Sequence, residues 1–279
     1  MEARRPTKQK QSAEDAAEEP METCEIARLP EELMSAVLSR TSPRDACRAA
    51  AVSPAFRAAA DSDALWACFL PPLADLPPLA NGELLPPHRK KDLFLRLSGS
   101  PVLLPGGLMS MWLDRETGAK CYMVSSRALS IRWGEWSWSP LADSRFSENA
   151  LLRSACWLVI CGNIHSKMLS KGSAYAAYLV YALAQDSCGL DSLDQDAYVS
   201  IRGTDITRQV CLQPNPQTGY AENIVFPRER DDGWMELELG EFVIEGDEDG
   251  DVSLDLMEKN FLNIKSGLIM QGIEVRRKS

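Results

Sequence analysis

Six prolines in the stretch 71–91 divide the chain into two parts with different residue patterns. They stand as pairs at 71–72, 77–78 and 86–87. Proline lacks a backbone N–H and fixes φ, so paired prolines disfavour both helix and central strand and favour an extended connector. The 279 residues are enough for one large domain or two small ones. We therefore expect two units, joined over 71–107 by a linker that contains a short helix at 93–97, followed by an apolar turn.

The stretch 29–70 favours three or four short helices. It is rich in Ala, Leu and Arg and lacks strand-like alternation. Further helix starts are expected at Ser42-Pro43, at Ser53-Pro54 and near Asp63, because capping side chains and proline suit the first turn. One helical face carries apolar side chains in two neighbouring rows: Leu29, Leu33, Val37, Met34 and Leu38. A unit this small buries little surface alone, so such a wide apolar face predicts a partner surface.

From about residue 108 the pattern favours β-strands. Met235, Leu237 and Leu239 alternate with Glu236 and Glu238, which is typical of a half-exposed strand. The run 155–164 is nearly all apolar, as in a strand buried on both faces, and 173–185 has the aromatic and β-branched content of a strand. Several strands separated by Gly, Asn, Asp and Pro predict an antiparallel sandwich.

Composition excludes several classes of function. The net charge of −10 disfavours binding to nucleic acid or to an anionic membrane surface, because phosphates are repelled. No apolar run is long enough to span a membrane, and the first 25 residues are too polar for a secretory signal and are expected to be disordered. We expect a protein of the cytoplasm, the nucleus or both, with free cysteines and without cofactor or metal.

The segment 29–66 resembles an F-box. The resemblance rests on an ordered set: Leu29-Pro30, Leu33, Val37, Leu38, Ser42-Pro43, Asp45, Val52-Ser53, Phe56-Arg57 and Leu65-Trp66. It implies an F-box over 26–70 that binds a Skp-type adaptor, and through it a cullin scaffold. The implied contact residues are Leu29, Pro30, Leu33, Val37 and Leu38, with Val52 and Trp66 completing or supporting the surface. The alternative is that these side chains pack on the following domain.

Most of the remaining chain is similar to the plant phloem protein 2 family of lectins. The similarity is carried by 93–104, 127–138, 145–170, 173–184, 231–242 and 265–276, which include RALSIRWGEWSW and DDGWMELELGEF. It implies a jelly-roll β-sandwich over 108–279, like a carbohydrate-binding module, that binds N-acetylglucosamine oligomers or N-glycans. An F-box followed by this domain is itself a known plant architecture.

The same resemblance implies a glycan site with an aromatic pair, Trp133 and Trp136, and an acidic pair, Asp251 and Glu258. Aromatic faces bind the apolar side of a pyranose, and carboxylates orient its hydroxyls. Two features depart from the family. Only Gly134-Glu135 separates the two tryptophans, which makes Trp138 a competing candidate for the second ring. In addition, Asp251 stands where Glu is usual. Alternatively, the tryptophans belong to the core, or this surface binds protein.

Other chemistry is less well supported. Asp247, Asp249, Asp251 and Glu258 have the spacing of a calcium loop, but Val252 replaces the required glycine, and a hairpin turn at Asp249-Gly250 explains the run better. No nucleophile motif surrounds His165, and there is no phosphate loop.

The sequence therefore predicts a non-catalytic substrate receptor of a Skp-cullin-F-box ubiquitin ligase, which recruits a glycoprotein or another protein. The alternatives are a stand-alone intracellular lectin and a structural interaction protein.

Overall fold

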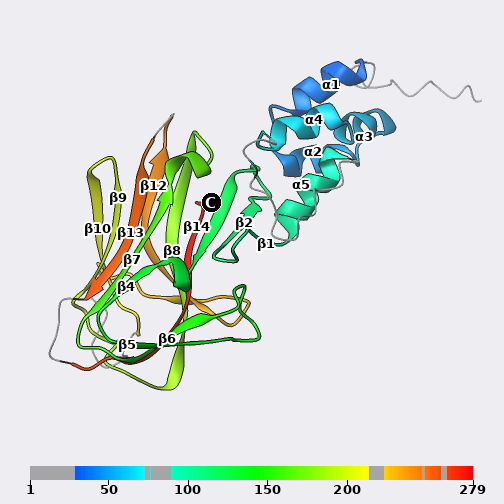
Figure 1. Cartoon of the computed structure of the whole chain (residues 1–279). Helices are drawn as coiled ribbons and strands as arrows, with labels where there is room; N and C mark the ends of the chain where they lie inside the picture. The colour runs from blue at the N-terminus through cyan, green and yellow to red at the C-terminus, as the bar shows by residue number, and fades with distance from the viewer. Residues whose placement is uncertain are drawn as a thin grey trace, which may run out of the picture.

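A small helical unit stands at one end of a larger β-sandwich in the computed structural model of the chain (Figure 1). The structure describes residues 29–72, 76, 89–213, 223–246, 249–258 and 263–278. The expected disordered tail over 1–25 and most of the proline-rich linker lie outside these residues. The predicted order, a helical unit followed by an antiparallel sandwich, is confirmed.

Four short helices form the helical unit: α1 Glu31–Leu38, α2 Pro43–Ala49, α3 Pro54–Ala60 and α4 Asp63–Phe69. The predicted starts are confirmed, and the reason is local. The side chains of Ser42, Ser53 and Ser62 each accept a hydrogen bond from the backbone N–H three residues ahead, which caps α2, α3 and α4. Among the described residues, no helix is both long and apolar enough to cross a membrane.

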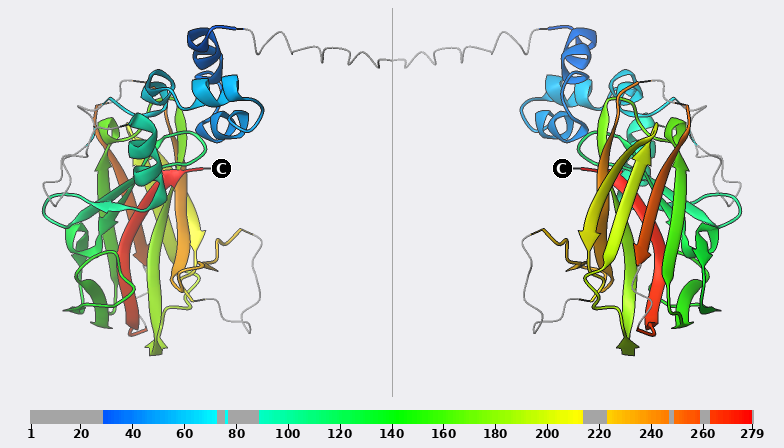
Figure 2. Two further views of the ribbon diagram at one scale, coloured as in Figure 1. Left: turned by 90° about the vertical axis from the view of Figure 1, so that its right-hand side faces the viewer. Right: turned by 90° about the vertical axis from the view of Figure 1, so that its left-hand side faces the viewer.

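A fifth helix, α5 Lys90–Gly99, lies between the helical unit and the sandwich (Figures 1 and 2). It is longer than the 93–97 segment expected from the sequence. The ring of Phe94 packs on Trp66, with centroids 5.1 Å apart. The backbone N–H of Lys90 donates to Asp63 Oδ1 over 2.9 Å, and Lys91 Nζ pairs with Asp61. Helix α5 is thereby fixed to α4.

The turn at 114–119 joins two strands of the sandwich and reaches the helical unit. Glu116 forms an ion pair with Arg44 of α2 at 2.7 Å. Arg115 Nε donates to the carbonyl of Ser98 in α5 over 3.0 Å. Gly118 has φ +77°, and a Cβ there would lie 2.4 Å from the carbonyl oxygen of Phe69. One continuous cluster of buried apolar side chains runs from α1 through α4 and α5 into the sandwich. The two units therefore share a core.

The sandwich consists of two antiparallel sheets (Figure 2). The larger has the order β1-β2-β3-β14-β8-β12-β11, with β6 pairing both β14 and β5. Its strands are β1 Val102–Leu103, β2 Met109–Leu113, β3 Lys120–Ser125, β5 Glu135–Ser139, β6 Asn149–Ser154, β8 Ser173–Cys188, β11 Arg228–Glu229, β12 Met235–Ile244 and β14 Ser266–Arg277. The smaller has the order β10-β9-β13-β7-β4. Its strands are β4 Ser130–Arg132, β7 Leu158–His165, β9 Gln195–Ile201, β10 Thr204–Val210 and β13 Asp251–Glu258.

The two sheets pack so closely at Gly240 and Gly162 that neither position has room for a side chain. A Cβ at Gly240 of β12 would lie 2.7 Å from Val199, and a Cβ at Gly162 of β7 would lie 3.1 Å from Ile273. The alternating apolar residues of β12, Leu237 and Leu239, are fully buried in this core. The predicted strand over 173–185 is confirmed as β8.

Three local expectations are wrong. Strand β7 is not buried on both faces, because the smaller sheet is an outer layer and Asn163 points to solvent. Glu236 of β12 is not solvated but almost fully buried. Asp249-Gly250 does not turn a hairpin, because the strand before it, β12, lies in the larger sheet and the strand after it, β13, lies in the smaller one.

Candidate functional site

Helix α1 exposes an apolar row beside the row that makes its core contacts. Met34 and Leu38 are buried, whereas Leu33 is 53% and Val37 60% exposed. Successive helical residues are about 100° apart, so two pairs spaced i, i+4 form two stripes of one helix. The outward stripe, Leu33 and Val37, stays exposed in the part of the chain that the structure describes. Leu29 and Pro30, just before the helix, are also exposed.

The remaining residues expected on the adaptor surface divide into two groups. Val52, in the turn after α2, is exposed. Leu38 is buried, so the structure moves it from the contact surface to a place beneath it. Trp66 is also buried, which fits the supporting place that the resemblance allowed for it. The reason for Trp66 is the shared core: its ring packs on Phe94, and its Nε1–H donates to the carbonyl of Ala60 over 2.7 Å. Figure 1 shows α1 on the side of the helical unit away from the sandwich.

Two tryptophans meet at the surface of the sandwich and form what we call the indole corner, Trp133 and Trp157. Trp133 directly follows β4, and Trp157 directly precedes β7. The ring centroids lie 5.7 Å apart with the planes at 80°. The two side chains are 62% and 45% exposed. Large exposed aromatic side chains in contact with each other are typical of binding surfaces.

The turn that carries Trp133 is conformationally strained. Trp133 has φ +66° and Gly134 has φ +91°. A left-handed conformation costs a side-chain-bearing residue about 1–2 kcal/mol. A Cβ at Gly134 would lie 2.7 Å from Ala155 Cβ and 2.8 Å from the carbonyl oxygen of Ser154, so only glycine fits there. Strain of this kind persists only where the surrounding structure imposes it, and it concentrates at functional sites.

Trp136 lies beneath this turn rather than beside Trp133 as a second platform. It is half-buried in β5, and its Nε1–H donates to the carbonyl of Trp133 over 3.1 Å. Trp138, two residues further on, is covered by the guanidinium of Arg127, which lies 3.9 Å from the ring centroid. The family resemblance implied a pair of Trp133 with Trp136. It missed Trp157, which only the sheet register brings to Trp133.

The two carboxylates expected at the glycan site lie at opposite ends of β13. In the pairing of β13 with β7, Asp251 lies opposite His165, whereas Glu258 lies opposite Leu158. The neighbour of Leu158, Val159, lies opposite Arg132 of β4, so Glu258 is at the end of β13 nearer to Trp133. The seven residue steps of β13 span roughly 23 Å. Asp251 therefore cannot join a site at Trp133. Of the four residues that the resemblance implied for the glycan site, the structure leaves Trp133 exposed, half-buries Trp136 and separates the two acids.

Glu258 lies at the end of β13 near the indole corner but is buried. Its Oε1 pairs with Lys265 Nζ at 3.0 Å, and both side chains are fully enclosed. Burial raises the pKa of Glu258, and the hydrogen bond and charge of Lys265 oppose that effect. Lys265 Nζ also donates to the carbonyl of Cys156 over 2.9 Å, immediately before Trp157. Glu258 thus supports the turn that carries Trp157 and is closed to solvent.

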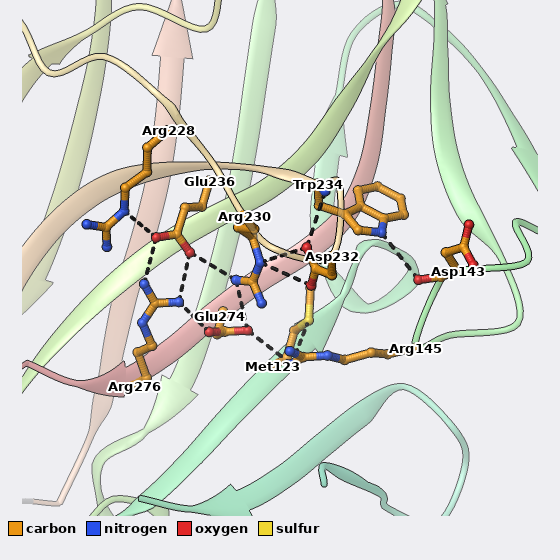
Figure 3. Close-up of polar contacts among 10 residues, drawn as sticks. All are labelled: Met123, Asp143, Arg145, Arg228, Arg230, Asp232, Trp234, Glu236, Glu274 and Arg276. Atoms are coloured by element: carbon orange, nitrogen blue, oxygen red, sulfur yellow. Dashed lines mark hydrogen bonds and ion pairs between the residues drawn. The ribbon is translucent and has the colours of Figure 1, made fainter.

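A second charged cluster covers the outer face of the larger sheet (Figure 3). Two nearly buried carboxylates, Glu236 and Glu274, lie among four arginines: Arg145, Arg228, Arg230 and Arg276. Arg276 bridges the acids, with contacts of 2.8 Å to Glu236 and 2.6 Å to Glu274. Its guanidinium also lies 3.9 Å from the ring centroid of Tyr178.

The arginines of this cluster neutralise the two buried carboxylates. Burial alone would raise the pKa of Glu236, but hydrogen bonds and charge from Arg276 and Arg228 outweigh it and lower the pKa to about 2. Figure 3 shows the side chains turned toward one another. Glu236 is therefore a constituent of the fold, almost fully buried and bonded to arginines on every side.

A calcium site finds no support in the part of the chain that the structure describes. Asp247 lies outside it. Asp251 and Glu258 belong to the straight strand β13, which carries them apart. No group of three or more potential metal ligands lies together among the described residues.

The fold and these surfaces define a two-part binding protein, a helical unit with an outward apolar stripe fixed to a β-sandwich with exposed indoles. The family model for phloem protein 2 matches residues 119–277, and the F-box-like model matches 26–70. The F-box protein PP2-B10 of Arabidopsis thaliana is 38% identical over 258 residues, which are 88% of this chain and 92% of the relative. The F-box protein SKIP3 of the same plant is 34% identical over 262 residues, which are 89% of this chain and 87% of the relative. The chain belongs to the phloem protein 2 family of F-box proteins.

Proposed function

We propose that this chain is the substrate receptor of a Skp-cullin-F-box ubiquitin ligase. The F-box binds a Skp-type adaptor, which links it to a cullin, and the sandwich recruits a glycoprotein for ubiquitination. The outward stripe of α1 carries this proposal, because Leu33 and Val37 are apolar side chains that the described part of the chain leaves exposed. Its position away from the sandwich leaves room for an adaptor there (Figure 1).

The receptor contributes proximity and no catalytic group of its own. Holding a substrate near the ubiquitin-charged partner raises their effective concentration, and the chemistry takes place on the partner enzymes. The indole corner supports recruitment through a glycan, since exposed aromatic rings bind the apolar faces of sugars. We expect the protein to act in the cytoplasm, the nucleus or both.

Co-purification with a plant Skp-type adaptor tests the first half of the proposal. The wild-type chain is expected to form a 1:1 complex. The double variant Leu33→Ala with Val37→Ala is expected to bind at least about 30-fold more weakly, as for interface anchors worth about 2 kcal/mol. Val243→Ala removes an equally exposed apolar side chain from the sandwich and is the matched control.

The result separates the receptor from a stand-alone lectin. A complex that is lost in the double variant and kept in the control supports the ligase role. A folded wild-type chain that binds no adaptor contradicts it, and the same protein that still binds sugar is a lectin without a ligase role.

A further inference from the structure

The indole corner differs from the aromatic pair that the chain order suggests. Trp133 and Trp157 meet at 80° with both rings open to solvent. Two planes at this angle enclose a concave corner, in which a ring stacked on one indole is bounded by the other. Trp136 has no such place, because it lies half-buried under Trp133 and uses its N–H on the backbone.

The backbone that carries each of the two indoles is fixed by neighbouring residues that lie outside the exposed corner itself. Gly134 packs on Ala155 and Ser154 and fixes the left-handed turn at Trp133, and the Trp136 N–H holds its carbonyl. The backbone of Ala155 forms two hydrogen bonds with Lys265, of 3.0 and 2.8 Å. The Glu258–Lys265 pair holds the carbonyl just before Trp157. Supports on both sides pre-organise the corner, which reduces the cost of ordering it upon binding.

We propose that Trp133 and Trp157 together form the sugar platform and that Trp136 is a positioning residue that acts through the Trp133 carbonyl. This assignment rests on the proposed glycan recruitment and names the residues that perform it. The ligand is a saccharide whose pyranose C–H face stacks on one indole while the other indole bounds it. Glu258 acts on the same site through Lys265 and does not touch the sugar.

Titration of the full chain with N,N′,N″-triacetylchitotriose tests the assignment. By calorimetry, or by NMR for weak binders, Trp157→Ala and Trp133→Ala are each expected to weaken binding at least 10-fold. Trp136→Phe keeps a ring but loses the N–H donor, and is expected to weaken binding about 3-fold to 5-fold, in line with the loss of one hydrogen bond. The matched control is Trp138→Phe, which removes an indole N–H from the same strand and is expected to leave affinity unchanged.

A double-mutant cycle tests the positioning role. If Trp136 acts through Trp133, the effect of Trp136→Phe disappears in the Trp133→Ala background, measured by NMR at millimolar sugar. A general loss of stability would not depend on that background. An effect of Trp136→Phe that persists there contradicts the positioning role.

The outcomes separate this inference from the function on which it rests. If the wild-type chain binds sugar and Trp157→Ala binds equally well, the platform assignment is overturned and glycan recruitment stands. If the folded wild-type chain binds adaptor but no chitotriose, the proposed glycan recruitment fails and the platform fails with it. Weak binding of Trp157→Ala beside normal binding of Trp138→Phe supports the assignment.

Discussion

The outward stripe of α1 and the indole corner both expose apolar side chains, but by different physical means. Leu33 and Val37 are exposed because helical spacing turns them away from Met34 and Leu38, and an ordinary helix needs no strain to do so. Trp133 is exposed because a left-handed turn forces it outward. The first surface can change without affecting the fold, whereas the second is built into the fold. Variants at Gly134, at Trp133 and in α1 test this difference, and Glu236→Gln tests a third surface, the charged face of the larger sheet.

The largest effect is expected at the strained turn. Gly134→Ala places a Cβ in the left-handed region and against Ala155, so it should lower the free energy of unfolding by about 3 kcal/mol. Gly172→Ala is the control, because Gly172 has φ +66° but no atom within 4 Å of its Cβ position, and it should cost about 1 kcal/mol. Urea denaturation measures both. Equal losses would show that packing does not fix the turn.

A second prediction concerns the charged outer face of the larger sheet. Glu236→Gln should lower the free energy of unfolding by about 2 kcal/mol at pH 7, since it weakens hydrogen bonds to charged arginines. Glu229→Gln, at an exposed residue of β11, is the control and should have little effect.

The same variant has a definite pH dependence. The folded pKa of Glu236, about 2, lies below the value of about 4.3 in an unfolded chain. The contribution of the Glu236 charge to the free energy of unfolding is therefore fully present above the unfolded pKa and is lost as pH falls toward 2. The stability gap between wild type and variant should shrink over this window, as measured by denaturation at pH 7, 4 and 2.5. A constant gap would contradict the role of its charge.

A smaller effect separates strain from ring contact at Trp133. Asparagine tolerates the left-handed region better than alanine. Trp133→Asn should therefore be more stable than Trp133→Ala by up to about 1 kcal/mol, although both lack the indole and both should bind sugar at least about 10-fold more weakly than the wild type. Thermal denaturation compares the two. Equal stability would mean that the turn relaxes once the indole is removed.

The smallest effect is expected at α1. Leu33→Ala with Val37→Ala should change the stability of the isolated chain by less than about 0.5 kcal/mol, because both side chains are exposed. The same double variant is expected to lose adaptor binding. A stability loss well above this value would place the stripe in the core of the fold.

Patterns of short range allowed much of this molecule to be predicted. The α1 stripe, the serine caps and the alternation in β12 each depend on neighbours within a few residues, so the sequence indicates them directly. The proline pairs likewise indicated two units. Leu38, which was expected on the contact surface, is buried in the core of the helical unit. The burial of Trp66 depends on Phe94, which lies outside the F-box segment.

Long-range register explains what could not be predicted. Trp157 meets Trp133 only because β4 pairs with β7, and Asp251 is separated from the corner only because β13 runs straight between them. The left-handed φ of Trp133 carries a weak signal, since the adjacent Gly134 is a turn residue, but a bulky side chain is rare in that conformation. The burial of Glu236 likewise depends on arginines far along the chain, such as Arg276.

Side-chain contacts, and not only the peptide connection, hold the F-box on the sandwich. Trp66 packs on Phe94, Arg44 pairs with Glu116, and the turn at Gly118 touches the backbone of Phe69. A protease that cut the chain between residues 72 and 89 would therefore leave two fragments that stay associated. Such a clipped molecule would still present the α1 stripe and the indole corner on one particle, at the spacing they have in the intact chain.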